Sequence, residues 1–121
     1  MLAFLLRSEP SLLFPLAPWD ELPEEQLPPP PWREGLGAVH LPVTTAVPRA
    51  QAWFDQGLAL LHLGWRGEAR RAFAEAARCD PRLALAWWGL ALTRGPGARC
   101  AAARLEASHK ALALSEGVSD A

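Results

Sequence analysis

The stretch AQAWFDQGLAL at residues 50–60 returns in altered form as ALAWWGLALTR at residues 84–94. Trp53 and Trp87 stand at matching places in the two stretches, 34 residues apart. The same spacing relates Ala50 to Ala84, Ala52 to Ala86 and Leu58 to Leu92. In both stretches apolar residues recur every three or four positions, which is the spacing of one face of an α-helix. The chain therefore carries a helical unit that is used twice.

Four helices are predicted from residue 48 onward, with short turns between them. Pro48 suits a first helical turn, and Gly64 suits a stop. Pro81 ends the second helix, because proline bars the helix from continuing through the residue before it. The sequence GPG at 95–97 separates the third helix from the fourth. We predict helices over residues 48–63, 67–79, 82–94 and about 98–116, and no segment favours a strand, so the predicted fold class is all-α.

Helix pairs repeated every 34 residues are typical of an α-solenoid, in which each pair packs against the next. The first unit, residues 50–83, resembles the tetratricopeptide repeat. Small, aromatic and proline residues stand where that repeat has its own, namely Trp53, Gly57, Ala69, Phe73, Ala76 and Pro81. The resemblance implies that Gly57 and Ala69 let two antiparallel helices approach closely. It also implies that Trp53 and Phe73 fill the wedge between them and the next pair.

The second unit, residues 84–117, matches this pattern less well. Its fitting residues are Trp87, Ala91 and Ala103. Ala107 stands where the repeat has a large aromatic residue, so we expect this unit to be looser than the first or to need a neighbour. If both units have the same structure, Trp53 and Trp87 should lie in equivalent surroundings.

Residues 40–97 also resemble the opening of a longer bacterial tetratricopeptide family of unassigned role. Its members tend to show a His-x-Pro-(Val/Ile)-(Ser/Thr)-Thr lead, an Ala-Gln…Phe-Asp-Gln-Gly-Leu helix, Asp-Pro, Ala-x-Trp-Gly and Gly-Pro. This chain reads HLPVTT, AQAWFDQGL, DP, AWWG and GP, and it departs from the family at LHLGWRGEA. Because members of that family are much longer, the resemblance implies a truncated or fragmentary member, and one alternative is a purely structural fragment.

The first part of the chain has a different composition. Ten of the twelve prolines lie within residues 1–48, including four in a row at 28–31. Proline fixes φ and removes a backbone donor, so neither a helix nor a central strand can run through this region. We therefore divide the chain into a Pro-rich extended leader (1–47), a helical domain (48–117) and a tail (118–121). The leader is either flexible or an arm that docks on the helices or on another chain.

Charge and hydropathy exclude several partners. The formal net charge is −1 and the pI is about 6.3, so nothing favours nucleic acid or an anionic membrane. No stretch reaches the ~20 apolar residues of a membrane span. The N-terminal MLAFLL is short and lacks a preceding basic residue, which disfavours a secretory signal and leaves the cytoplasm as the default compartment.

Chemically reactive side chains are sparse and scattered. His40, His62 and His109 do not stand three or four residues from one another or from a cysteine, so no metal or cofactor site is predicted. Neither a catalytic triad nor a phosphate-binding loop has local support. Cys79 and Cys100 fall thirteen repeat positions apart. That offset corresponds to about 20 Å along a helix axis, too far for a disulfide. The alternative to a binding protein is an exported metal- or redox-linked protein using these cysteines and histidines.

The resemblance also implies a binding surface, because the first helix of each tetratricopeptide pair lines the concave face. The corresponding residues are Gln51, Phe54, Leu58, Leu61 and His62 in the first unit, and Leu85, Trp88 and Leu92 in the second. The chaperone-binding subfamily uses Lys and Asn there to clamp a terminal carboxylate, and the apolar Phe54 and Leu58 imply that this clamp is absent. We expect a non-catalytic module that binds a protein or peptide through an apolar groove, with self-association possible. Whether the leader covers that groove is left open.

Overall fold

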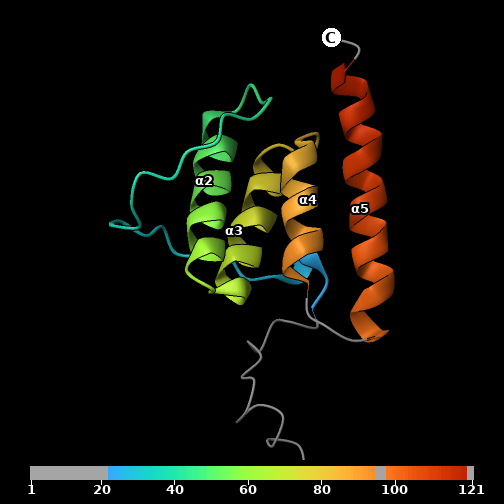
Figure 1. The fold of residues 1–121 in the computed structure, drawn as a ribbon, viewed down its shortest axis with the longest axis horizontal. Helices are drawn as coiled ribbons and strands as arrows, with labels where there is room; N and C mark the ends of the chain where they lie inside the picture. The colour runs from blue at the N-terminus through green and yellow to red at the C-terminus, as the bar shows by residue number, and fades with distance from the viewer. Residues whose placement is uncertain (1–21, 95–97, 120–121) are drawn as a thin grey trace, which may run out of the picture.

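The computed structural model describes residues 22–94 and 98–119. Over these residues it contains a short 3-10 helix and four α-helices: η1 (Glu24–Gln26), α2 (Pro48–His62), α3 (Arg66–Cys79), α4 (Ala84–Thr93) and α5 (Ala98–Ser119). The four α-helices lie side by side in chain order, each packed against the next (Figure 1). No strand occurs in the described residues. The prediction of an all-α chain with packed adjacent helix pairs is confirmed for them, whereas the predicted turn at 95–97 lies outside them.

Local sequence signals explain where the first helix begins and ends. Pro48 occupies the first helical position, where a missing N–H costs nothing. At the other end Gly64 has a φ of +80°, a backbone conformation that glycine adopts without strain. The N–H of Gly64 donates to the carbonyl of Leu61 at 3.0 Å, and that of Trp65 donates to Leu60 at 2.9 Å. These two bonds satisfy carbonyls of the last turn of α2 and set the direction of the turn that leads into α3.

The core is built around Phe73 of α3, which is fully buried. Its ring lies between Gly57 of α2 and Gly89 of α4. A Cβ atom at Gly57 would lie 2.6 Å from Cε1 of the ring, and one at Gly89 would lie 2.6 Å from Cγ. The ring centroid of Phe54 is 5.6 Å from that of Phe73. Gly57 therefore admits the aromatic side chain between the helices, and Gly89 does the same from the other side.

Replacing Gly89 by alanine is expected to destabilise the fold. The new methyl group would overlap the base of the Phe73 ring, which cannot swing away because Gly57 closes the opposite side. Overpacking costs about 1–3 kcal/mol. This cost is at least as large as the ~1 kcal/mol by which alanine stabilises a helix relative to glycine. We expect Gly89→Ala to lower the free energy of unfolding by up to about 2 kcal/mol in urea denaturation. A gain in stability would show that the helices are free to separate here.

The two repeated tryptophans occupy matching helix positions but have different ring contacts. Both are half-buried against the core. Trp53 packs edge-on against Trp32 of the leader, with 5.3 Å between ring centroids. Trp87 donates its indole N–H to the carbonyl of Pro81 at 3.0 Å, and the Lys110 ammonium lies 3.7 Å from its ring centroid. The prediction of equivalent surroundings is therefore wrong for the two rings, because the leader flanks α2 whereas α5 flanks α4.

Part of the Pro-rich leader lies on the helical domain. Residues 22–47 run past α3 and α4 and then along the outside of α2 (Figure 1). Leu27 is only 3% exposed and belongs to the core, and five further side chains pack partly buried against it: Leu22, Leu36, Val39, Val43 and Val47. Between Glu24 and Gln26 the backbone forms one 3-10 turn where an extended chain was expected. Residues 22–47 therefore contact the helices through both apolar and polar side chains.

Candidate interaction surface

The eight residues predicted to line a binding groove are divided between the core and the surface. Phe54 is 0% exposed and Leu58 is 7% exposed, so neither is open to a partner. Gln51, Leu61 and Leu85 are half-buried, and His62 is exposed. Trp88 is 40% exposed and Leu92 is 50% exposed. The continuous apolar groove expected along both first helices is therefore not present, because Phe54 packs against Phe73 instead of facing solvent.

The leader occupies the polar side of α2. The side-chain amide of Gln51 accepts the N–H of Val43 and donates to the carbonyl of Leu41, both at 2.9 Å. Asp55 accepts the N–H of Leu41 at 3.2 Å and lies 2.6 Å from the His40 ring. Of these two α2 residues, only Gln51 was predicted from the sequence to make contacts, and the contacts predicted for it were with a partner protein.

Gln56, one turn further along α2, repeats this pairing from a buried position. It is 4% exposed, accepts the N–H of Arg33 and donates to the carbonyl of Pro31, both at 3.0 Å. A primary amide has both a donor and an acceptor, so it matches the peptide group of an extended chain. Buried polar groups are normally paired, and here the leader supplies the pairing.

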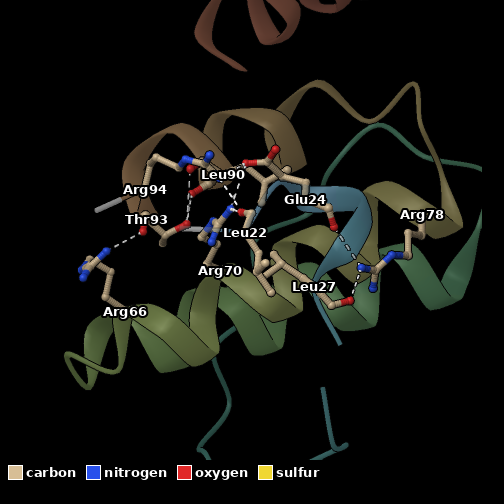
Figure 2. Close-up of polar contacts among 10 residues, drawn as sticks. Leu22, Glu24, Leu27, Arg66, Arg70, Arg78, Leu90, Thr93 and Arg94 are labelled. Carbon is tan, nitrogen blue, oxygen red and sulfur yellow. Dashed lines mark hydrogen bonds and ion pairs between the residues drawn. The ribbon is translucent and has the colours of Figure 1, made fainter. Parts of the chain in front are cut away.

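Two arginines of α3 and Arg94, which follows α4, bind backbone carbonyls of Leu22, Glu24 and Leu27 (Figure 2). The fully buried Arg70 donates to the carbonyl of Leu22 and to the carboxylate of Glu24. Arg94 donates to the same two groups, at 3.0 and 2.9 Å. Arg78 donates to the carbonyls of Glu24 and Leu27. Each guanidinium group has five N–H donors and no acceptor, so it suits a row of carbonyls.

The proline run receives the same kind of bond. Arg71 donates to the carbonyl of Pro28 at 3.1 Å and to that of Pro29 at 2.6 Å. Because proline has no N–H, a polyproline segment presents only acceptors, and only an outside donor can satisfy them in a folded protein. The arginines of α3 therefore bind the leader of the same chain, and the sequence did not predict these contacts.

The C-terminal end of α4 is held by a side-chain bond within the helix and by Arg66 of α3 (Figure 2). The buried hydroxyl of Thr93 donates to the carbonyl of Gly89 at 2.7 Å. The carbonyl of Thr93 accepts a hydrogen bond from Arg66 at the start of α3, at 2.9 Å. The bond from Arg66 satisfies a carbonyl that the end of a helix leaves open.

One cavity of about 420 Å³ lies between η1, α3, α4 and α5. Its lining includes three acids, Glu24, Glu25 and Glu106, three bases, Arg78, Arg94 and Lys110, and the ring of Trp87. Four of these charges already have other contacts, since Glu24 pairs with Arg94, Arg78 pairs with Glu75, and Lys110 lies on Trp87. The mixture of charges defines no single class of ligand.

The open apolar surface lies instead on the opposite flank of the last helix pair. Trp88 and Leu92 of α4 are joined there by Leu105 and Leu112 of α5, which are 57% and 59% exposed. Two shallow hollows lie on either side of Trp88, one lined by Leu92 and Leu105 and the other by Leu85 and Leu112. We call Leu85, Trp88, Leu92, Leu105, Ser108 and Leu112 the α4–α5 face. The sequence analysis named its α4 residues but missed those of α5, although Leu105 and Leu112 stand seven residues apart.

The cysteines and histidines do not gather into a site. Cys79 is half-buried, Cys100 is buried, and both are free thiols. Burial, followed by the neighbouring Glu75 carboxylate, raises the pKa of the Cys79 thiol, so the thiol stays protonated to a higher pH than usual. Among the described residues no three His, Cys, Asp or Glu side chains are grouped so that they could hold a metal ion. His62 donates from Nδ1 to the carbonyl of Leu58 at 2.8 Å.

The comparisons of this chain with known proteins found no match. No protein-family model matches it, and neither a curated protein nor a solved structure matches it. Within the described part of the chain, none of the helices has the length and apolar character needed to cross a membrane.

Proposed function

We propose that this chain is a non-catalytic interaction module of the tetratricopeptide type, in which α2–α3 and α4–α5 are the two repeats. Its binding surface is the α4–α5 face, and its ligand is a polypeptide segment. The observation that carries the proposal is that Trp88, Leu92, Leu105 and Leu112, each between 40% and 59% exposed, gather around two hollows. Grouped exposed apolar side chains mark interaction sites, whereas scattered ones do not.

The 34-residue period supports this assignment. Trp88 and Leu92 stand one period after Phe54 and Leu58. The two residues of the first unit are covered within the chain, whereas their counterparts are open. Because Phe54 and Leu58 are buried, the matching Trp88 and Leu92 are also suited to burial. Repeat units normally bury such residues against a neighbouring unit.

The chemistry of the face favours an amphipathic helix as the ligand. The hollows follow the groove between two helices, and apolar side chains spaced three, four and seven residues apart would enter them in turn. From Ala84 to Thr93 α4 carries no charged residue, so the surface selects for apolar contact and not for charge.

The test is binding of helical peptides at nanomolar protein concentration, followed by fluorescence anisotropy. Peptides with leucine at helical spacing are expected to bind, and Leu112→Glu should weaken their binding at least about tenfold, because burying a leucine is worth roughly 1.5–3 kcal/mol. Leu63→Glu is the matched control, since Leu63 is 56% exposed but lies at the end of α2. Equal loss in both variants, or no binding of any such peptide, would contradict the proposal.

A further inference from the structure

We propose that the polypeptide held by the α4–α5 face is a second copy of this chain, paired through the same face about a two-fold axis. This inference rests on the proposed function and names its partner. Three observations carry it: the residues that replace arginine in the second repeat, the closed state of the opposite end of the helix stack, and the charge of the face.

At two of the three positions where arginines of α3 bind the leader, the second repeat has leucine, whereas Arg104 stands one period after Arg70. Leu105 stands one period after Arg71, and Leu112 stands one period after Arg78. In the first repeat these arginines donate to the carbonyls of Pro28, Pro29, Glu24 and Leu27. Leucine donates nothing, so an extended segment on α5 would leave its carbonyls without partners at these positions. The face therefore favours a partner whose backbone is satisfied internally, such as a helix surface.

The other end of the stack is closed by the leader. On α2, Gln51, Asp55 and Gln56 are engaged by the backbone of residues 31–43. Trp53 is covered by the ring of Trp32. A head-to-tail arrangement would place the α2 side of one copy on the α4–α5 face of the next, and these bonds would have to break first. Pairing of like with like uses only surface that both copies already expose.

The charge of the face also suits self-pairing. The side chains around the two hollows are Ala, Leu, Trp and Ser, with Arg104 as the one charged residue among them. Two copies of such a surface meet with little repulsion, and no acidic or basic partner is selected by it. Trp88 forms the ridge between the hollows, so the ridge of each copy can enter a hollow of the other, as side chains do between packed helices.

The first experiment is sedimentation equilibrium of the full chain. We expect a dimer at micromolar concentration. Leu112→Glu should raise its dissociation constant about 100-fold, because a two-fold axis places the new charge in the interface twice. Leu63→Glu, at a site of similar exposure, should leave the dimer unchanged. Circular dichroism of both variants shows that the helices remain folded.

The second experiment fixes the arrangement by disulfide formation. Ser108 lines both hollows and is exposed, so Ser108→Cys should form a disulfide with its own counterpart under mild oxidation. Thr44→Cys, on the exposed leader, should not. A mixed disulfide between the two variants would mean head-to-tail pairing and would overturn the proposal.

Other outcomes separate this inference from the proposed function. A chain that stays monomeric while helical peptides bind the face overturns the second copy as partner and leaves the interaction module standing. A monomer in which Leu112→Glu lowers stability and no peptide binds overturns both proposals, and it points to residues 1–21 of the same chain as the cover. A dimer that Leu112→Glu does not weaken overturns the assignment of the face.

Discussion

Phe73→Ala is expected to lower the free energy of unfolding by about 4 kcal/mol, because truncating a buried phenylalanine removes its transfer free energy and leaves a cavity. The ring is 0% exposed and lies against both α2 and α4, so its loss loosens two helix contacts at once. Urea denaturation followed by circular dichroism measures the change. Phe73→Leu is the control, and it should cost much less because leucine fills part of the space.

The glycines on either side of the ring make this prediction sharper. In the native chain an alanine at Gly57 or Gly89 would overlap the ring. In the Phe73→Ala background the same methyl group would enter the vacated space, so Gly89→Ala should become neutral or stabilising. Residues in contact are expected to depart from additivity in this way. If the penalties simply add, the ring does not occupy the position between the two glycines.

Glu24→Ala is expected to release the leader and to lower the free energy of unfolding by about 2–3 kcal/mol. Its carboxylate pairs with Arg70 and Arg94, whose side chains are 0% and 9% exposed. Removing one partner of a buried pair leaves a charge without compensation, at a cost of about 3–5 kcal/mol. We take a lower figure because the Glu24 side chain is 22% exposed and water can replace part of the loss.

Amide hydrogen exchange of residues 22–33 separates release of the leader from general destabilisation. Glu24→Ala should speed exchange of the leader far more than that of α3 and α4. Glu25→Ala is the control, because Glu25 is its exposed neighbour in the same turn. Glu24→Gln should give an intermediate effect, since an amide oxygen still accepts a hydrogen bond. If Glu25→Ala has an equal effect, the buried pair is not what holds the leader.

The sequence predicted the helices well because their ends depend on local chemistry. Pro48, Gly64 and Pro81 act through backbone constraints that do not require knowledge of the fold. Gly57 and Phe73 were identified through the resemblance to the tetratricopeptide repeat, which has a small and a large residue at these positions. Gly89 was missed because it has no counterpart one period earlier: position 55 is Asp, which faces the leader and not the core.

The contacts of the leader could not be predicted from local sequence. Arg70, Arg71 and Arg78 are interspersed with alanines along α3, as the solvated side of any surface helix would be. Their partners lie between 42 and 54 residues earlier in the chain, and nothing in the sequence marks a carbonyl as an acceptor. The same limit applies to Phe54, whose burial depends on where the following helix lies.

The bonds between the leader and the end of α4 have a consequence for synthesis. Leu22 and Arg94 are separated by 72 positions, so residues 22–29 leave the ribosome long before the last guanidinium group that holds them. Contacts between such distant residues form late in folding. Until those contacts form, the segment is exposed to solvent and can aggregate by pairing as a β-strand. Proline opposes such pairing because it lacks the N–H that a β-ladder needs. We therefore expect the four prolines at 28–31 to oppose strand pairing by the nascent leader until the arginines that bind it have been made.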